Sequence, residues 1–255
     1  MSQPLQTQPA MLPRTPFGWA GLGLGTGVLA LAPLFSTPFY VELITSALIA
    51  AMLALSLQLL VGVTGLVSLG QGALYGLAAY IVYFMTLDGV AKPMWMTLPV
   101  AMFVAAVAAF VIGLFALRTK GFFFLMVTLA FGQMIYFVFH DTNIGGGTDG
   151  AYLSRPLISA FGWTLELPRR QRYLGSYYVA LTQLVLMYAV LALLLRSLFG
   201  RVLEGIRINE SRMRAIGFDT TRAKLIAFTL AGAFAGAAGH MWAMHRAFVN
   251  PEIVS

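Results

Sequence analysis

Residues 200–228 read GRVLEGIRINESRMRAIGFDTTRAKLIAF, a basic segment between two long apolar runs. From Arg196 to Lys224 the chain carries seven Lys or Arg residues against three acids. Short loops rich in Lys and Arg stay on the cytoplasmic side of a membrane protein. The segment therefore predicts a cytoplasmic loop at residues 196–224, and this loop sets the orientation of the apolar runs on either side.

The rest of the composition is typical of a polytopic membrane protein. Hydrophobic residues make up 59% of the 255 residues, charged residues only 10%, and the mean hydropathy is +0.82. Soluble domains average about 45–50% apolar residues. The net charge of +7 lies largely in loops beside the apolar runs, as positive-inside topology requires, so no nucleic-acid partner is expected. The sequence has no Cys, which excludes disulfides and thiolate metal sites.

Seven apolar runs are each close to the roughly 20 residues that a membrane helix needs. They predict an all-α membrane domain over residues 17–255, with about seven transmembrane helices and the cytoplasmic loop before the last one. The predicted spans are Phe17–Phe35, Val41–Val61, Leu66–Met85, Met94–Leu117, Phe122–Phe139, Tyr177–Leu195 and Leu225–His245.

Alternation from the cytoplasmic loop places the polar tail, residues 1–16, inside the cell, and no cleaved signal peptide is expected there. The turn at residues 118–120 falls inside as well. Arg169, Arg170 and Arg172 fall on the outer side, against the charge rule, in a long segment that also carries acids.

Small and polar residues interrupt the third run between Gly62 and Gly76, so a break in the helix or very close packing is expected there. Irregular backbone at membrane depth is tolerated only where protein or a water-filled cavity satisfies its polar groups. A substrate path and a packing contact both fit this composition. In the seventh run, Gly232 and Gly236 form a GxxxG pair, for which close helix packing is the favoured interpretation.

Motifs for catalysis are absent from the sequence. It contains no GxxxxGK[ST] phosphate loop and no GxGxxG motif. The three histidines, His140, His240 and His245, have no acids at metal-ligand spacing, and Glu42 is the only acid within an apolar run. We expect no catalytic residues, no metal site and no enzymatic activity.

The cytoplasmic loop predicts a short amphipathic helix. Arg201, Glu204, Arg207 and Glu210 recur every three residues, which would let opposite charges pair along one face, with Val202, Leu203 and Ile206 on another. Gly217 suits the end of a helix, and Asp219 suits the N-cap of the next. Two interpretations remain open from this pattern: a solvated or lipid-surface helix held by its own ion pairs, or a docking surface.

Four motifs occur in order along the chain. Thr64–Ala73 reads TGLVSLGQGA, Phe123–Gly132 reads FFLMVTLAFG and Gly145–Gly150 reads GGGTDG. The fourth runs from Arg207-Ile-Asn209-Glu210 through Ala215-Ile-Gly217 and Lys224 to Ala235-Gly236-Ala-Ala-Gly239. Together they resemble the LivM-type permease subunits of branched-chain amino-acid ABC importers. The chain departs from that pattern at Gly145 and at Met213. The departure at Met213 suggests an altered docking surface. The chain stops at Ser255, where the family continues.

The resemblance implies a permease subunit of the bacterial inner membrane that imports branched-chain or related hydrophobic amino acids. Its implied partners are a second permease subunit, two ATP-binding subunits and an external substrate-binding protein, and ATP is bound by the partners, so that no cofactor is expected in this chain. Coupling to the ATP-binding subunits would fall to Arg207, Asn209, Glu210, Ala215 and Gly217. The translocation pathway would include Ser68, Gly70, Gln71, Gly72 and Thr128, and the external turn Gly146, Gly147, Asp149 and Gly150.

Three other hypotheses remain at this level. Related permeases import urea, aromatic acids or sugars, and nothing in the apolar runs identifies a substrate side chain. An ATP-independent secondary carrier would require clusters of charged residues within the membrane, which the apolar runs largely lack. An intramembrane enzyme would require a convergent nucleophile, base or metal set.

Overall fold

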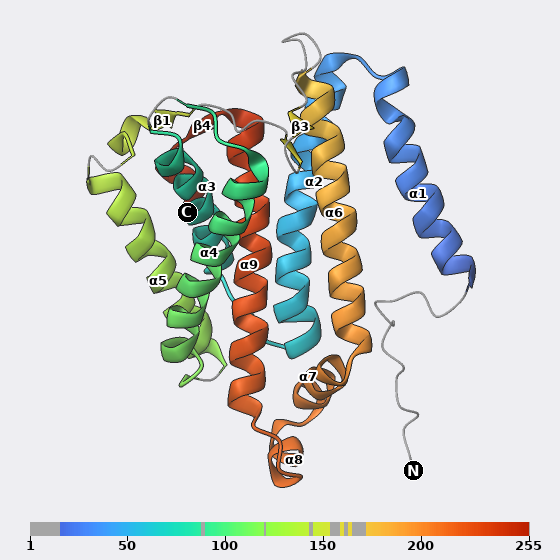
Figure 1. Ribbon diagram of the computed structural model, residues 1–255. Helices are drawn as coiled ribbons and strands as arrows, with labels where there is room; N and C mark the ends of the chain where they lie inside the picture. The colour runs from blue at the N-terminus through green and yellow to red at the C-terminus, as the bar shows by residue number, and fades with distance from the viewer. Residues whose placement is uncertain are drawn as a thin grey trace.

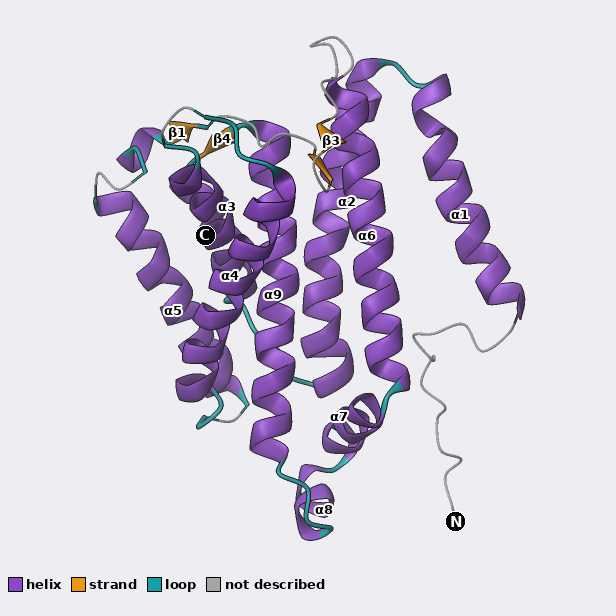
Figure 2. Ribbon diagram, viewed as in Figure 1, coloured by secondary structure: helices purple, strands orange, loops and turns teal. Residues whose placement is uncertain are grey.

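The computed structural model describes residues 16–87, 90–119, 121–142, 145–153, 159–160, 163–164 and 172–254; side chains are described from residue 23 onward, except at residues 159–160, 163–164 and 172. Most of these residues are helical (Figures 1 and 2). The α-helices are α1 (Pro16–Phe35), α2 (Pro38–Leu57), α3 (Gln71–Met85), α4 (Met94–Ala116), α5 (Phe122–Asp141), α6 (Arg172–Arg196), α7 (Leu198–Ile208), α8 (Glu210–Ala215) and α9 (Thr220–Arg246). The predicted tail up to residue 15, Lys120, Arg169 and Arg170 lie outside the described residues.

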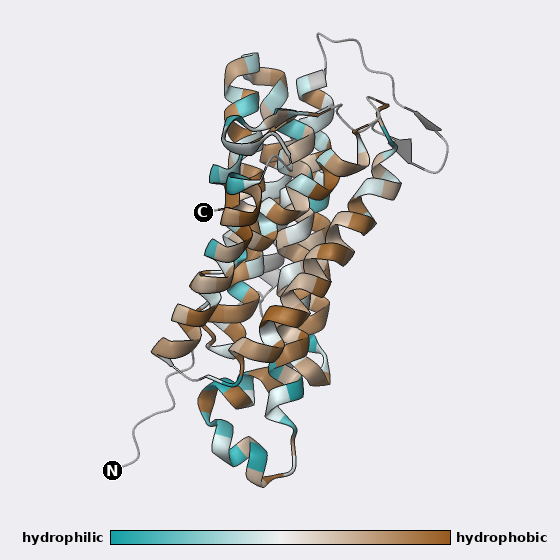
Figure 3. Cartoon of the chain, turned by 90° about the vertical axis from the view of Figure 1, so that its left-hand side faces the viewer, coloured by the Kyte–Doolittle hydropathy of each residue, from teal (hydrophilic) through white to brown (hydrophobic). Residues whose placement is uncertain are grey.

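The helices confirm the all-α polytopic membrane fold. Within the described part of the chain, five segments are long and apolar enough to cross a membrane: Pro38–Thr64, Met94–Ala116, Phe122–Asp141, Tyr173–Arg196 and Thr220–Arg246. The described part of α1 and the whole of α3 are shorter apolar helices, so the predicted count of seven is not confirmed. Figure 3 shows hydrophobic residues along the bundle and hydrophilic ones gathered at the end that carries α8.

Helix α9 forms the centre of the bundle. Two thirds (67%) of its most apolar stretch is buried, compared with 22% in α5. Its glycines meet the neighbouring helices directly: a Cβ at Gly236 would lie 2.7 Å from Ala105 Cβ on α4, and a Cβ at Gly239 would meet the backbone oxygen of Tyr75 on α3. Glycine and alanine at these positions let the helix axes approach closely. The contacts support the packing interpretation of the seventh run.

The expected break in the third run is present. Helix α2 continues as a π-helix, η1 (Gln58–Thr64), which ends at Gly65 with φ of 74°. Residues 65–70 are not helical, and α3 begins at Gln71, not at the predicted Leu66. The predicted span was too long because its apolar residues continue across the break, and hydropathy alone does not distinguish a helix from an apolar loop.

The opposite end of the bundle from α8 carries the short strands. Strand β1 (Ala151–Tyr152) pairs antiparallel with β4 (Phe248–Val249), and β2 (Ser159–Ala160) with β3 (Trp163–Thr164). Two 3-10 turns, η2 (Gly147–Asp149) and η4 (Pro251–Val254), lie near the first pair. The η4 turn enters the bundle between α3 and α5, where Val254 is buried against Gly76.

Candidate functional site

Helix α7 has the amphipathic character that the sequence predicts. Leu203 and Ile206 are buried against the bundle, while Glu204 and Arg207 are exposed. The Arg207 guanidinium donates a hydrogen bond to the backbone oxygen of Gly62 in η1. The helix therefore lies on the end of the bundle and is tied to the segment that leads into the break.

The predicted row of ion pairs along one helix is wrong. Helix α7 ends at Ile208, and Asn209 is extended, with φ of −158° and ψ of 97°. Among the described residues no ion pair joins Arg201, Glu204 or Arg207. The physical reason is that the Asn209 side chain caps a new helix, α8, by accepting a hydrogen bond from the Arg212 backbone N–H at 2.9 Å. Asn favours such caps over helix interiors.

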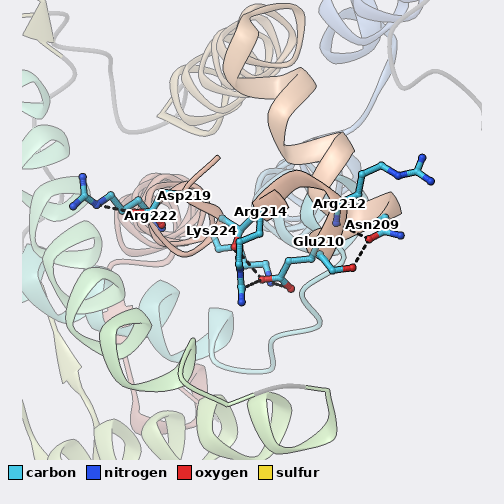
Figure 4. Close-up of polar contacts among 9 residues, drawn as sticks. Asn209, Glu210, Arg212, Arg214, Asp219, Arg222 and Lys224 are labelled. Atoms are coloured by element: carbon cyan, nitrogen blue, oxygen red, sulfur yellow. Dashed lines mark hydrogen bonds and ion pairs between the residues drawn. The ribbon is translucent and has the colours of Figure 1, made fainter. Parts of the chain in front are cut away.

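Glu210 connects α8 to α9. Its Oε1 accepts hydrogen bonds from Arg214 Nη2 at 2.9 Å and Thr220 Oγ1 at 3.1 Å, and its Oε2 accepts from Lys224 Nζ at 2.6 Å (Figure 4). Thr220 is buried, and the Lys224 side chain is only 16% exposed. One carboxylate thus interacts with two cations and, together with the hydrogen bond from Arg214 Nη2 to Thr220 Oγ1, links α8 to α9 across the turn between them.

The turn between α8 and α9 follows the sequence prediction. Gly217 has a φ of 100°, a left-handed conformation that favours glycine, just past the end of α8. Asp219 caps α9 by accepting from the Arg222 backbone N–H at 3.0 Å. The predicted coupling residues Asn209, Glu210, Ala215 and Gly217 therefore lie together on one compact element at the tip of the bundle.

The apolar surface of this tip was not predicted. Met213, which the sequence places on an altered docking surface, is half-buried against Gly205 of α7. Ile208 (76% exposed), Ile216 (65%) and Phe218 (44%) are the large apolar residues that remain open around α8. Their sequence signal is weak, since none of them belongs to a long apolar run.

The charge environment of Glu210 predicts a pH dependence of this tip. Partial burial alone would raise the pKa of Glu210, but hydrogen bonds from Lys224 and Thr220 and the charge of Arg214 outweigh it and hold the pKa below 4.5. A lowered pKa contributes stability that is present at neutral pH and is lost as pH falls through the folded pKa. A spin label at Ser211→Cys should gain mobility only below about pH 4.5, and Glu210→Gln should remove that transition.

Most of the predicted pathway residues meet at the break. Gln71 Oε1 accepts a hydrogen bond from Ser56 of α2 at 3.1 Å, and Thr128 Oγ1 of α5 accepts from the Leu69 backbone N–H at 3.3 Å. Gly70 N–H donates to Ser68 Oγ at 3.3 Å. Gly72 is half-buried in the first turn of α3 and makes none of these contacts. Ser56 was missed because it lies in a different apolar run.

Some hydrogen-bond donors at the break have no partner among the described residues. The Gln71 side chain is 1% exposed, and its Nε2 has no hydrogen-bond partner among the described residues. The backbone N–H groups of Gln71, Gly72 and Ala73, at the start of α3, likewise form no hydrogen bond within that part of the chain. Unpaired donors at a helix N-terminus favour a negatively charged group.

A cavity of about 610 Å³ lies between the break and α8. Its walls include Gly65 and Leu66 at the break, Leu117 and Phe122 at the turn between α4 and α5, and Glu210. Arg207, Arg214 and Lys224 also line it. Ser68, Gln71 and Thr128 do not line it, so these predicted pathway residues lie outside the cavity.

Comparison with known proteins decides the family. Residues 39–255 match the family model of the branched-chain amino acid transport system permease component. The chain belongs to this permease family. It is 34% identical over 244 residues to the high-affinity branched-chain amino acid transport system permease protein LivM of Escherichia coli (strain K12), covering 88% of this chain and 57% of the relative. The LivM protein of Salmonella typhimurium (strain LT2) is also 34% identical, over 230 residues covering 83% of this chain and 54% of the relative.

The chain therefore spans just over half the length of these two relatives. No solved structure matches it. The family and the apolar helices together make this permease a multi-pass protein of the inner membrane.

The turn that is predicted from the sequence to be external lies at the opposite end of the bundle from α8 (Figure 1). Gly146, Gly147 and Gly150 all have positive φ, and a Cβ at Gly150 would meet the backbone oxygen of Val249 in β4. Gly145, the departure from the family pattern, faces the ring of Tyr80. Asp149 is exposed. The turn packs a loop against β4, and these contacts account for its glycines.

The permease shows no metal centre within the residues that the structure describes: no three His, Asp or Glu side chains gather there closely enough to hold an ion. His240 is buried in α9, and its Nε2 lies 2.9 Å from Thr97 Oγ1 of α4. This contact joins α9 to α4 inside the bundle.

Replacing Asn209 with Ala should fray α8. Loss of an N-cap side chain costs about 1 kcal/mol, and a helix of six residues has few other contacts with which to offset that loss. Hydrogen exchange at residues 210–215 should accelerate about fivefold, whereas Asn209→Asp, which keeps a capping oxygen, should exchange as the wild type does. Unchanged exchange in Asn209→Ala would show that Glu210 alone holds α8 in place.

Proposed function

We propose that this chain is a permease subunit of an ATP-binding-cassette importer, which moves branched-chain or related hydrophobic amino acids across the inner membrane. The observation that supports this most directly is the carboxylate of Glu210, which joins the exposed helix α8 to the central helix α9. A passive surface helix would need no such connection to the buried core. The names of the two relatives support the same transport system and the same substrate class.

The partners follow from the chemistry of the tip. Ile208, Ile216 and Phe218 are open around α8, with Arg212 beside them, and this mixture of apolar and basic groups suits a protein surface. We assign it to an ATP-binding subunit, two of which would bind the ATP for the complex. A second permease subunit and an external substrate-binding protein complete the assembly, and this chain performs no catalysis of its own.

The proposed coupling runs from the tip to the core. Closure of the ATP-binding subunits would displace α7 and α8, and Glu210 would pass that displacement to α9 through Lys224 and Thr220. Asn209 and Gly217 set the two ends of α8, Ala215 lies on its exposed side, and Arg207 ties α7 to η1. The external turn, Gly146, Gly147, Asp149 and Gly150, would face the substrate-binding protein.

The proposed pathway passes the break. A zwitterionic amino acid carries charges that need polar partners, while an aliphatic side chain tolerates apolar walls. Gln71 Nε2 and the N–H groups at the start of α3, which have no partner among the described residues, suit the substrate carboxylate. Ser68 and Thr128 would supply further polar groups, and Gly70 and Gly72 would let the substrate approach the backbone. Thr128 and Gly132 of α5 pack against Gly70 here, so α5 would have to move away from α3 to admit substrate.

Gln71→Leu should reduce the rate of amino-acid uptake at least about tenfold, the effect of losing roughly 1.4 kcal/mol of favourable contact along the path. Leu is similar to Gln in volume but removes the acceptor of the Ser56 hydroxyl, so the amount of folded protein is measured beside uptake. Thr45→Val is the matched control, since Thr45 is also buried but bonds only to Val41 of its own helix. Normal uptake by Gln71→Leu would remove this residue from the pathway.

A pull-down of the tagged chain from its native membrane in mild detergent tests the assembly. Recovery of two ATP-binding subunits and a second permease subunit is expected. A stable chain recovered without ATP-binding subunits would refute the importer and favour an ATP-independent carrier. Competition for uptake by leucine, phenylalanine, urea and ribose then separates the proposed substrate class from the alternatives.

A further inference from the structure

A groove of about 840 Å³ runs between α1, α2 and α6. Figure 1 shows α1 as the outermost helix, beside α6. Tyr177 and Tyr178 of α6 donate hydrogen bonds to the backbone oxygens of Leu29 and Ala30 of α1 at one end of the contact. Below these bonds the facing surfaces do not close, and the groove lies between them.

The lining of the groove changes along its length. Helix α2 contributes Ala51, Ala54 and Leu55, its continuation η1 contributes Gln58, and α6 contributes Leu181, Leu184, Val185, Tyr188, Ala189, Ala192, Leu193 and Arg196. Both sets follow the three- and four-residue spacing of a single helix face. Because α2 and α6 run in the same direction (Figure 1), Gln58 and Arg196 fall at the same end, the end next to α7.

The dimensions of the groove match one leaflet. Leu181 and Arg196 lie about 22 Å apart along α6 at a rise of 1.5 Å per residue. Half of a bilayer that is about 40–45 Å thick with its headgroups measures roughly 20–22 Å. The apolar walls therefore lie at the depth of acyl chains, and the guanidinium of Arg196 lies at the depth of headgroups.

The lining of the groove favours a lipid over a helix as its occupant. Helix packing gains little from apolar area alone in lipid. An apolar occupant with a negative end suits both the apolar walls and the charge of Arg196.

We propose that the groove binds an anionic phospholipid of the leaflet next to α7. An acyl chain of this lipid lies between α1, α2 and α6, and its phosphate lies at Arg196. Gln58 lies beside the headgroup as a second polar group. Because residues 196–224 are predicted to lie on the cytoplasmic side, this leaflet is the cytoplasmic one. The bound lipid fills the space between α1 and the rest of the bundle and so holds α1 in its position.

Native mass spectrometry of the purified full chain, with any subunits that accompany it, tests the proposal. The delipidated protein is titrated with phosphatidylglycerol or with phosphatidylcholine of identical chains. The wild type should retain about one phosphatidylglycerol with a preference of about fivefold, the effect of one cation at the membrane surface. Arg196→Gln should abolish the preference. Arg201→Gln, which makes the same charge change outside the groove, should keep it.

A second pair of variants tests the apolar walls. Ala189 lines the groove, whereas its neighbour Val190 is exposed outside it. Ala189→Phe should reduce retention of both lipids at least about threefold, and Val190→Phe should not. The proposal would be overturned if Arg196→Gln and Arg201→Gln lost the lipid preference equally, or if Ala189→Phe retained lipid as the wild type does. It would also be overturned if Ala189→Phe lost a partner permease while its lipid retention stayed unchanged. Lipid retention does not depend on transport, so the proposed function can fail separately.

Discussion

Glu210→Gln is expected to reduce coupled uptake at least about tenfold while the assembled complex keeps most of its ATP hydrolysis. The substitution removes the charge that holds Lys224 and Arg214, and hydrogen bonds to charged groups are each worth about 1.5–3 kcal/mol. The Lys224 side chain is only 16% exposed and would lose its charged acceptor. Helix α8 would then move without carrying α9. Uptake and ATP hydrolysis measured in the same proteoliposomes give the coupling ratio directly.

Glu204→Gln is the matched control. Glu204 lies on the exposed face of α7 and forms no ion pair among the described residues, so its loss changes the loop charge equally without touching the link to α9. Coupled uptake by Glu204→Gln should stay near wild type. Coupled uptake that survives in Glu210→Gln would refute the role of this carboxylate in coupling, and an equal loss in both variants would assign the effect to loop charge.

Gly239→Ala is expected to destabilise the protein by about 3 kcal/mol, the upper end of the usual cost of overpacking a core. The added methyl group would meet the backbone oxygen of Tyr75, and a backbone atom cannot rotate out of the way as a side chain can. The helices α9 and α3 would have to separate. The midpoint of thermal unfolding in detergent, followed by size-exclusion chromatography, should fall clearly below that of the wild type.

Gly27→Ala tests whether the effect belongs to the contact. A Cβ at Gly27 of α1 meets nothing within 4 Å, and Ala is favoured over Gly in a helix by about 1 kcal/mol. This variant should therefore unfold at or above the wild-type temperature. A Gly239→Ala protein as stable as Gly27→Ala would show that α9 and α3 are less tightly packed than their contacts indicate.

Much of the tip of the bundle could be predicted from sequence because caps and turns depend on neighbouring residues. Gly217 and Asp219 lie where local backbone preferences place them. Glu210 was assigned to the correct loop but to the wrong partners. A spacing of three residues predicts pairing only within one helix. Helix α7 ends at Ile208, before Glu210, because Asn209 caps the next helix.

The break could also be predicted from sequence, but its contacts could not. The glycines between Gly62 and Gly76 indicate irregular backbone, yet only the packing of α2 against α3 brings Ser56 to Gln71. The groove at Arg196 depends in the same way on three helices that are distant in sequence. Local patterns contain no information on which apolar runs will be neighbours.

The small-residue contacts of α9 have a mechanical consequence. Where Gly232, Gly236 and Gly239 meet α4 and α3, the closest contacts are with backbone atoms and Ala methyl groups, which have no side-chain rotamers to rearrange. A displacement applied to one end of α9 therefore cannot be absorbed by side-chain adjustment at these contacts. Helices α9, α3 and α4 thus form a stiff unit, so a displacement made at one face of the membrane can be transmitted to the other face with little loss.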